Sequence, residues 1–182
     1  MARTTTDRDD VPGWDIPGPA SMDRPTPRRR LRLLRPRSGV VALGLAVSHL
    51  MTKPAFAALT FGNWSRVLVG QINRGHYHFV VDESGRVAGF LGWAETSEQG
   101  AESWLAGRDL PDAAARDGDC MVINAWAADD AAVNHLLLAA ARRAGQGKRL
   151  VYFKRHYKDG RTRPMRLSVN GFVAGHLGRS EG

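Results

Sequence analysis

Residues 75–95 contain two largely apolar segments separated by a polar one, and we expect the fold to be built around this stretch. Residues 77–81 and 86–94 are rich in aromatic and β-branched side chains, and the Asp-Glu-Ser-Gly segment between them has the composition of a hairpin turn. The pattern predicts two antiparallel strands. Gly89 and Gly92 leave gaps in the second strand, which indicate a β-bulge or the close approach of another group to the backbone.

Helical periodicity appears on both sides of this hairpin. Apolar residues recur at helical spacing in four segments, which predict helices at 41–51, 55–72, 98–105 and 131–144. Further strands are predicted at 120–127, 150–157 and 161–169, the last two forming a hairpin. Because such a sheet must be covered by helices, the fold class is α/β (α+β), with a mixed, mainly antiparallel sheet flanked by helices.

The N-terminal part of the chain has a different composition. Residues 1–38 are rich in proline and polar side chains and contain few large apolar ones, so they cannot offset the entropy cost of ordering. We therefore predict a disordered basic tail over residues 1–38, followed by one folded domain over residues 39–178.

An export signal is the alternative for the end of this tail. An arginine cluster at 28–35, an apolar run at 40–47 and the sequence Ala55-Phe56-Ala57 resemble its three parts. The apolar run is short, however, and Lys53 and Pro54 lie between it and the supposed cleavage site. We therefore favour a short helix that ends before Pro54.

Composition and charge narrow the function further. The chain has 182 residues, a formal net charge of +8, one cysteine (Cys120) and no apolar run long enough to span a membrane. A cytoplasmic protein without an internal disulfide fits best. Ten Lys and Arg residues against one acid lie between residues 142 and 166, which indicates an acidic partner.

Several motifs occur in a recognisable order. They are Gly44 with Pro54 ten residues later, Gln-Ile-Asn-Arg-Gly-His-Tyr at 71–77, Arg-Val-Ala-Gly-Phe-Leu-Gly-Trp-Ala at 86–94, and Gly118-Asp119 before a strand. In this order and spacing the chain from Gly44 to about Leu177 resembles the RTX toxin-activating lysine acyltransferases. That family moves a fatty acyl chain from acyl carrier protein to internal lysines of a protoxin.

The resemblance implies a GNAT-like fold, acyl-acyl carrier protein as donor substrate, no bound cofactor or metal, and a protoxin-like acceptor protein. Two departures bear on the chemistry. The position of the family's proposed catalytic histidine is Phe56 here, and that of its aspartate is Asn124. Neither side chain is an effective general base, so His49 and His76 become the candidate bases. We expect Asn124 to contact the developing oxyanion, and Tyr77 and Trp93 to bind substrate.

Each candidate also has a purely structural alternative. His49 fits a histidine packed between two helices. His76 and His78 alternate with Tyr77, so the two histidines share one face of a strand; this pair lacks further ligands at metal-site spacing and favours a groove-lining face over zinc. Asn124, if buried, needs a hydrogen-bond partner whether or not it acts in catalysis.

The basic region contains the residues expected to bind the carrier protein. They are Arg142, Arg143, Lys148, Arg149, Lys154 and Arg155. Residues 142–147 also match R-x-x-G-x-G, the pyrophosphate motif of CoA-using GNAT enzymes. We interpret this copy as a helix C-terminus, because phosphate groups bind where a helix begins.

The sequence therefore favours a protein-lysine fatty acyltransferase of the toxin-activating type. The first alternative is a catalytically inactive homologue that binds acyl carrier protein or the acceptor. A basic nucleic-acid-binding protein is less favoured, and a homodimer is left open as a further association.

Overall fold

The computed structural model describes residues 29–110, 112–156 and 161–169. Most of the predicted tail, the turn of the last predicted hairpin and the C-terminal residues from 170 lie outside the described residues. No described helix is long and apolar enough to cross a membrane.

Six strands form one sheet in the order β1-β2-β3-β4-β5-β6. They are β1 (Arg32–Leu34), β2 (Tyr77–Val81), β3 (Val87–Thr96), β4 (Cys120–Ala128), β5 (Leu150–His156) and β6 (Thr162–Ser168). Neighbouring strands are antiparallel except β4 and β5, which are parallel. The predicted mixed, mainly antiparallel sheet is thereby confirmed.

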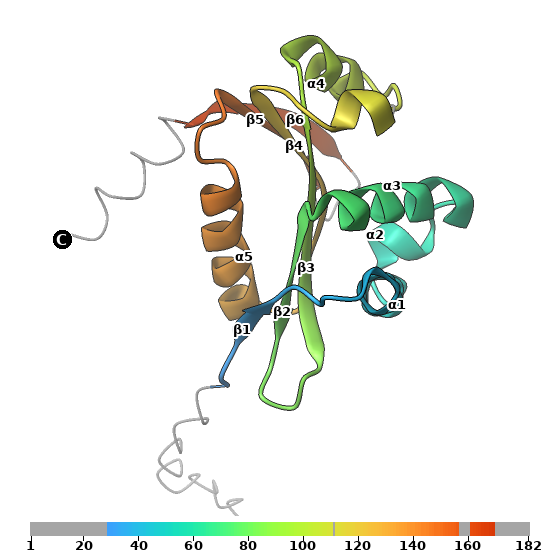
Figure 1. Cartoon of the computed structure of the whole chain (residues 1–182), viewed down its shortest axis with the longest axis vertical. Coiled ribbons are helices and arrows are strands. Elements are labelled where there is room, and N and C mark those ends of the chain that lie inside the picture. The colour runs from blue at the N-terminus through green and yellow to red at the C-terminus, as the bar shows by residue number, and fades with distance from the viewer. Residues whose placement is uncertain (1–28, 111, 157–160, 170–182) are drawn as a thin grey trace, which may run out of the picture.

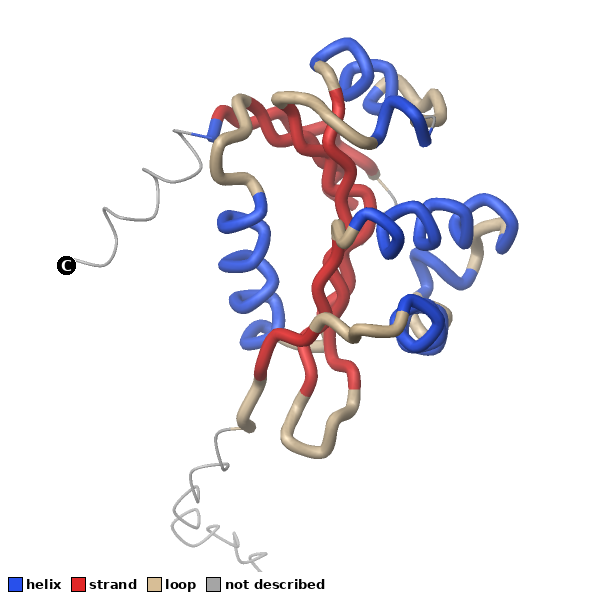
Figure 2. The backbone as a smooth tube through the Cα atoms, in the orientation of Figure 1, coloured by secondary structure: helices blue, strands red, loops and turns tan. Residues whose placement is uncertain are grey.

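Helices cover both faces of this sheet (Figures 1 and 2). They are α1 (Gly39–Leu50), α2 (Pro54–Ala57), α3 (Phe61–Arg74), α4 (Glu98–Leu105) and α5 (Ala131–Ala144), with a short 3-10 helix η1 (Asp112–Ala115). Helix α5 lies on one face, whereas α1, α2 and α3 lie on the other. Helix α4 contacts β4 and β5 at one end of the sheet.

Alternating strand residues divide the core between these two faces. Tyr77 and Phe79 of β2 pack with Phe90 and Leu50 in the cluster beneath α1 and α3. Val80, Leu91 and Trp93 pack instead with Leu137 of α5. The central hairpin is therefore buried on both sides.

Two predictions about the N-terminal third were wrong. Residues 32–34 were assigned to the disordered tail, but they form edge strand β1, in which Leu33 pairs with Val80 of β2. The arginine-rich composition concealed this strand. The Arg29 guanidinium, which bonds to Asp82 and Asp130, helps to hold the segment in place.

The second error concerns the single helix predicted at 55–72. The chain forms α2 and α3 there, because residues 58–60 leave the helix and Thr60 adopts an extended conformation before Phe61. Apolar side chains continue through the break at helical spacing, so periodicity alone does not reveal it.

Candidate functional site

The parallel strands β4 and β5 separate part of the way along the sheet. Their pairing runs from Cys120 with Leu150 to Ile123 with Phe153. Beyond these residues β4 stays paired with β3, whereas β5 stays paired with β6. We call residues 124–128 of β4 and 154–156 of β5 the fork. In the fork the facing edges of β4 and β5 are not paired with each other.

Asn124 lies at the point where the fork opens. Gly92 of β3 pairs with Ala125 and Trp93 pairs with Ile123, so Asn124 is the extra residue of a β-bulge. A bulge re-aims a side chain and interrupts the hydrogen-bonded ladder. The bulge expected from the glycine gaps in β3 is therefore present at Gly92.

Gln71 of α3 fixes the Asn124 side chain. Its Nε2 donates a hydrogen bond to Asn124 Oδ1. The Gln71 amide fills the space that a Cβ on Gly92 would need, which explains why glycine is required there. Because Asn124 Oδ1 accepts from Gln71, the Nδ2 group of Asn124 is the part of this amide that remains to donate to a substrate.

Apolar side chains line the other face of the fork. Ile123, Trp126 and Phe153 are partly buried against the α5 cluster. Trp126 is oriented by its Nε1, which donates to Asn134 Oδ1 at 3.0 Å. The α5 side of the fork therefore offers an aromatic surface beside the position of Asn124.

Two arginines follow this apolar surface. Arg155 of β5 lies directly opposite Arg163 of β6 in the antiparallel register. This arginine pair is two residues beyond Phe153, at the open end of the fork.

His76 and His78 share a face, as predicted, but it is the face opposite to the Asn124 side chain. The His76 ring stacks on Trp93 at 5.6 Å between centroids, and the His78 ring lies 5.7 Å from Trp93. Trp93 packs with the α5 cluster, whereas Gln71 and Asn124 meet on the α3 side. His76 is also two strands away from β4, a separation of roughly 10 Å.

The surroundings of the two histidines lower the pKa of both. Burial, followed by the nearby Arg35 and Arg143, lowers the pKa of His78 to about 4. Burial is also the main cause that lowers the pKa of His76, although Glu95 opposes it. His76 Nε2 lies 3.6 Å from the Glu95 carboxylate, which also binds Lys148 Nζ at 2.5 Å.

His49 lies at the other end of β4. It is buried, its pKa is lowered chiefly by that burial, and its charged neighbours are Lys53, Arg86 and Asp129. Asp129 follows Asn124 by five residues, a distance of roughly 16 Å along a strand. The structure therefore does not bring His49 to Asn124.

Phe56 and Tyr77 belong to the cluster beneath α1 and α3. Phe56 packs edge-on to Trp64, with ring centroids 6.5 Å apart. Tyr77 is buried, and its hydroxyl donates to the Pro36 carbonyl at 3.2 Å. Tyr77 therefore supports the site from within the core, and Trp93 lies on the opposite face of the sheet from it.

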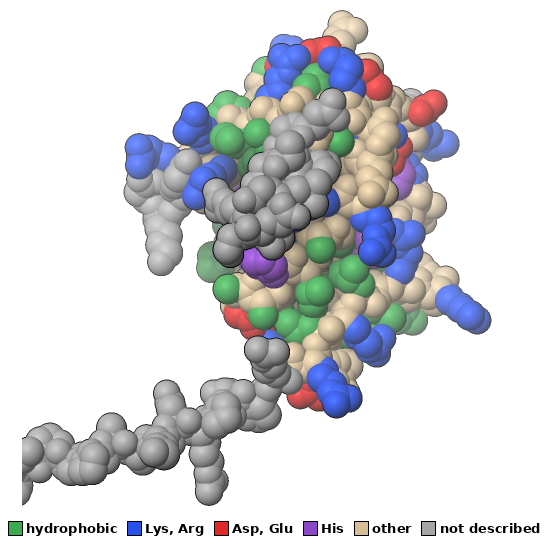
Figure 3. All heavy atoms as spheres, turned by 90° about the vertical axis from the view of Figure 1, so that its left-hand side faces the viewer, with side chains coloured by type: hydrophobic (Ala, Val, Ile, Leu, Met, Phe, Trp, Pro, Cys, Tyr) green, Lys and Arg blue, Asp and Glu red, His purple; other side chains and the backbone are tan. Residues whose placement is uncertain are grey.

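Part of the predicted carrier-binding set is engaged inside the molecule. Lys148 binds Glu95, and Arg149 binds Asp119 and Glu98. Lys154 lies over the Trp104 ring at 4.6 Å. On the α5 side, Lys and Arg side chains occur at several separate places rather than in one patch (Figure 3).

Two acidic side chains lie at the beginning of α5, where a phosphate group would otherwise bind to the helix N–H groups. Asp130 accepts from Val133 N at 2.9 Å and so uses a helix N–H that an anion would need. Asp129 adds a second carboxylate, which is bound by Lys53 and Arg86. The R-x-x-G-x-G copy closes α5 at the C-cap Gly145, as expected, and cannot replace this site.

The fork lies apart from the groove between α1 and α3. Within the described ranges, no group of three or more His, Cys, Asp or Glu side chains is placed to hold a metal ion. A groove of about 300 Å³ opens elsewhere, between α1 and α3, and Asn124 is not among the residues that line it.

The chain matches no protein-family model and no curated protein. Among solved structures it is similar to a GphF GNAT-like decarboxylase in complex with isobutyryl-CoA, with 20% identity, coverage of 71% of this chain and 67% of that chain, and a TM-score of 0.45. It is also similar to the GNAT family N-acetyltransferase YhbS from Escherichia coli in complex with CoA, with 11% identity, coverage of 81% and 86%, and a TM-score of 0.41. Both are GNAT-type proteins, and each match has a TM-score below 0.5. At this level of similarity, no ligand or activity passes from either protein to this chain.

Sequence reasoning selected Asn124 but missed its surroundings. Gln71 is the first residue of the motif at 71–77, but the position of Gln71 in the sequence does not show that its side chain points toward β4. The sequence predicts a strand around Trp126 and places Phe153 and Arg163 in the basic region, but only the separation of β4 from β5 brings the three residues to one place.

Proposed function

We propose that this protein is a protein-lysine acyltransferase that moves a fatty acyl chain from acyl carrier protein to a lysine of a protoxin-like partner. The observation that carries the proposal is the fork itself, where a bulge places Asn124 beside separated strands and Gln71 orients its amide. The family resemblance supplies the substrate classes.

In the proposed reaction the lysine amine attacks the thioester carbonyl carbon and forms a C–N bond. The C–S bond breaks, and the departing sulfur takes up the proton lost by the amine. Asn124 Nδ2 donates to the carbonyl oxygen as negative charge develops on it, an interaction that strengthens in the transition state. Neither candidate histidine lies near Asn124. In this proposal the rate therefore depends on how the site holds the lysine amine and the thioester together.

In this proposal the acyl chain lies on the α5 side of the fork, and the thioester carbonyl reaches Asn124 between the unpaired parts of β4 and β5. Ile123, Trp126 and Phe153 offer an apolar surface for the acyl chain. The Arg155–Arg163 pair suits the phosphate of a carrier protein's phosphopantetheine arm. Asp129 and Asp130 at the start of α5 disfavour the pyrophosphate of CoA there, which favours a carrier-bound thioester.

The direct test combines the full chain, acylated carrier protein of several chain lengths and the protein encoded beside it. The expected result is a mass increment on a lysine of that partner, together with release of the unacylated carrier. No increment with any chain length would end the enzyme proposal. Substituting CoA thioesters in the same assay should give much slower transfer.

A non-catalytic binding protein is the second candidate, and one observation favours it. Phe56 packs in an apolar cluster, and both candidate histidines lie away from Asn124. This alternative predicts saturable binding of acylated carrier protein without turnover. The internal pairing of Lys148 and Arg149 disfavours nucleic-acid binding, which would need those charges free.

A further inference from the structure

The α1–α3 layer carries one sign of charge. Residues 29–81, which form β1, α1, α2, α3 and β2, contain no Asp or Glu. Their charged side chains are Arg29, Arg30, Arg32, Arg35, Arg37, Lys53, Arg66 and Arg74. Acids outside this stretch pair with two of them, Asp82 and Asp130 with Arg29 and Asp129 with Lys53, whereas Arg37 and Arg66 are both exposed. The surface that this layer presents is therefore basic.

Exposed apolar side chains gather on the same layer. Among the described residues, all of the large hydrophobic side chains that are exposed belong to α1, α3 or the segments adjoining them: Val40, Val41, Met51, Leu59, Phe61, Val67 and Val69. Val40 is 83% exposed and Phe61 is 62% exposed. A concentration of this kind marks an interaction surface, because scattered single exposures are the ordinary case.

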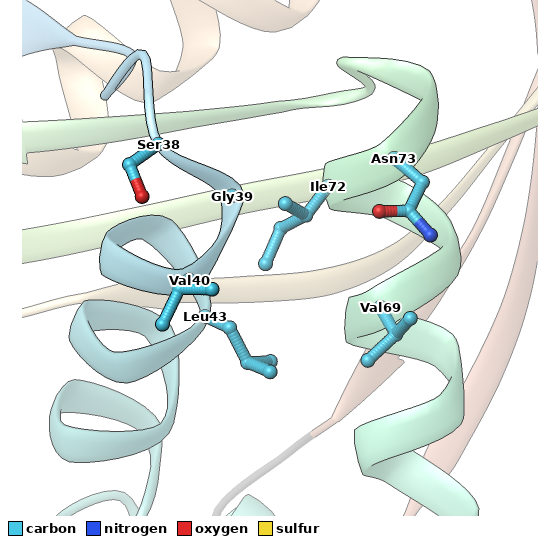
Figure 4. A pocket seen from close by; sticks show the side chains of 7 residues that line it. All are labelled: Ser38, Gly39, Val40, Leu43, Val69, Ile72 and Asn73. Atoms are coloured by element: carbon cyan, nitrogen blue, oxygen red, sulfur yellow. The ribbon is translucent and has the colours of Figure 1, made fainter.

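A groove runs between the two helices of this surface. Val40 and Leu43 of α1 face Val69 and Ile72 of α3 across a volume of about 300 Å³ (Figure 4). At one end the groove is bounded by Ser38, next to the exposed Arg37. The groove therefore has apolar walls, and a basic residue, Arg37, lies next to the end bounded by Ser38.

Aromatic side chains form the tip of the surface where α2 meets α3. Phe61 packs edge-on to Trp64 with ring centroids 5.5 Å apart, and Phe56 also packs edge-on to Trp64, with centroids 6.5 Å apart. No residue of α2 is buried, so this tip extends from the body of the domain (Figure 1). Aromatic rings are well suited to the boundary between lipid headgroups and acyl chains.

A second copy of the chain is a poor occupant for this surface. In a two-fold dimer the same patch meets itself, so Arg37 and Arg66 would approach their counterparts with no acid from residues 29–81 to pair with. The favoured partner instead combines negative charge, which pairs with the arginines, with an apolar region that takes up the exposed apolar side chains.

We propose that the α1–α3 surface, defined by Val40, Phe61, Val69 and the flanking Arg37 and Arg66, docks on an anionic lipid bilayer. The apolar side chains enter the headgroup boundary, and the arginines pair with acidic headgroups. This association is peripheral, in agreement with the finding that no described helix is suited to span a membrane.

The test is co-sedimentation of the full chain with vesicles of phosphatidylcholine alone or mixed with phosphatidylglycerol. We expect binding to the mixed vesicles and little binding to the neutral ones. Phe61→Ser with Val69→Ser should weaken binding about tenfold or more, since both side chains are exposed and can be changed without disturbing the core. Arg37→Glu with Arg66→Glu should weaken it at least as much, because each basic residue near an anionic surface contributes about fivefold.

Arg108→Glu is the matched control, because Arg108 is an exposed arginine just after α4 and outside the proposed surface. It should leave vesicle binding within about twofold of the original protein, and circular dichroism should show all variants folded. Quenching of Trp64 by lipids brominated in their acyl chains should report insertion of the tip, and Trp64→Phe should remove that quenching.

Three outcomes would overturn the proposal. The first is an absence of binding to the mixed vesicles. The second is unchanged binding by the Phe61 and Val69 variant, which would assign the attraction to basic residues elsewhere in the chain. The third is a dimer or a complex with acidic carrier protein that the same substitutions dissociate, which would assign the surface to a protein partner.

Discussion

Gln71 of α3 and Asn124 of β4 are joined by a hydrogen bond that ties a helix to the bulge at the fork. The bond forms only because Gly92 has no side chain to occupy the same space. Gln71 is fully buried and Asn124 is not, so the pair connects the core to the proposed thioester site.

The first prediction separates the roles of these two residues in acyl transfer. Asn124→Ala should lower kcat about 10²- to 10³-fold, the usual effect of losing one oxyanion donor. Gln71→Leu should lower kcat less, about tenfold, and the double variant should be no slower than Asn124→Ala alone, because Gln71 acts through Asn124. Steady-state kinetics of transfer measure all three.

Gln99→Leu provides the control for this series, since Gln99 is an exposed glutamine on α4. It should leave kcat and KM unchanged. Additive losses in the double variant would show that Gln71 contributes independently of Asn124.

The second prediction concerns Gly92. In Gly92→Ala the new Cβ would overlap the buried Gln71 amide, so the free energy of unfolding should fall by about 1–3 kcal/mol. Adding Gln71→Ala should restore part of this loss by making room. Gly44→Ala is the matched control: nothing lies near its Cβ, and alanine favours a helix interior, so it should stabilise by roughly 0.5–1 kcal/mol. Urea unfolding measures each value, and equal effects at both glycines would refute the steric explanation.

Most elements of this fold could be predicted from the sequence because each follows a local rule. Ser97 and Asp130 begin helices as N-caps, with side chains that accept from Gly100 N and Val133 N. Gly75 ends α3 in the left-handed conformation, with φ of 71°. Such signals depend on neighbours in the chain, so they can be read without a structure.

The parts that were missed depend on contacts distant in sequence. Strand β1 exists because Leu33 and Leu34 find an open edge of β2, although their arginine-rich surroundings indicate a tail. The positions of the candidate bases relative to Asn124 also depend on such distant contacts. His49 and His76 were selected by helical and strand position, but the sheet places His76 on the opposite face from the Asn124 side chain, a relationship that only the tertiary fold determines.

The third prediction is a pH dependence of stability centred on His78. The pKa of His78 is about 4 in the folded protein, lowered first by burial and then by Arg35 and Arg143, against 6.5 as its ordinary value. As the pH falls, His78 therefore binds a proton in the unfolded chain before it does so in the folded protein. Stability from this residue is fully present above about pH 7 and is lost as the pH falls from 6.5 through 4.

Urea unfolding at pH 7 and pH 4.5 measures this effect. In the original protein His78 should account for a loss on the order of 2 kcal/mol, after allowance for partial solvent exposure. His78→Gln should show a correspondingly smaller loss between the two pH values. His135→Gln, a change at an exposed histidine of α5, should leave the loss unaltered. If His78→Gln and the original protein lose the same stability, His78 does not titrate as the structure indicates.

The last prediction uses the two positions where the chain departs from the family it resembles. Phe56→His restores an imidazole in α2, and Asn124→Asp restores a carboxylate whose oxygens still accept from Gln71 Nε2. If transfer depends on holding the reactants and on the Asn124 donor, Asn124→Asp alone should lower the rate about 10²-fold, since a carboxylate cannot donate to the oxyanion. Phe56→His alone should change the rate by less than about threefold near neutral pH, because catalysis in the original protein does not use this position. Transfer that appears only in the double variant, with none in the original protein, would instead identify the natural chain as a binding protein that has lost its proton-transfer pair.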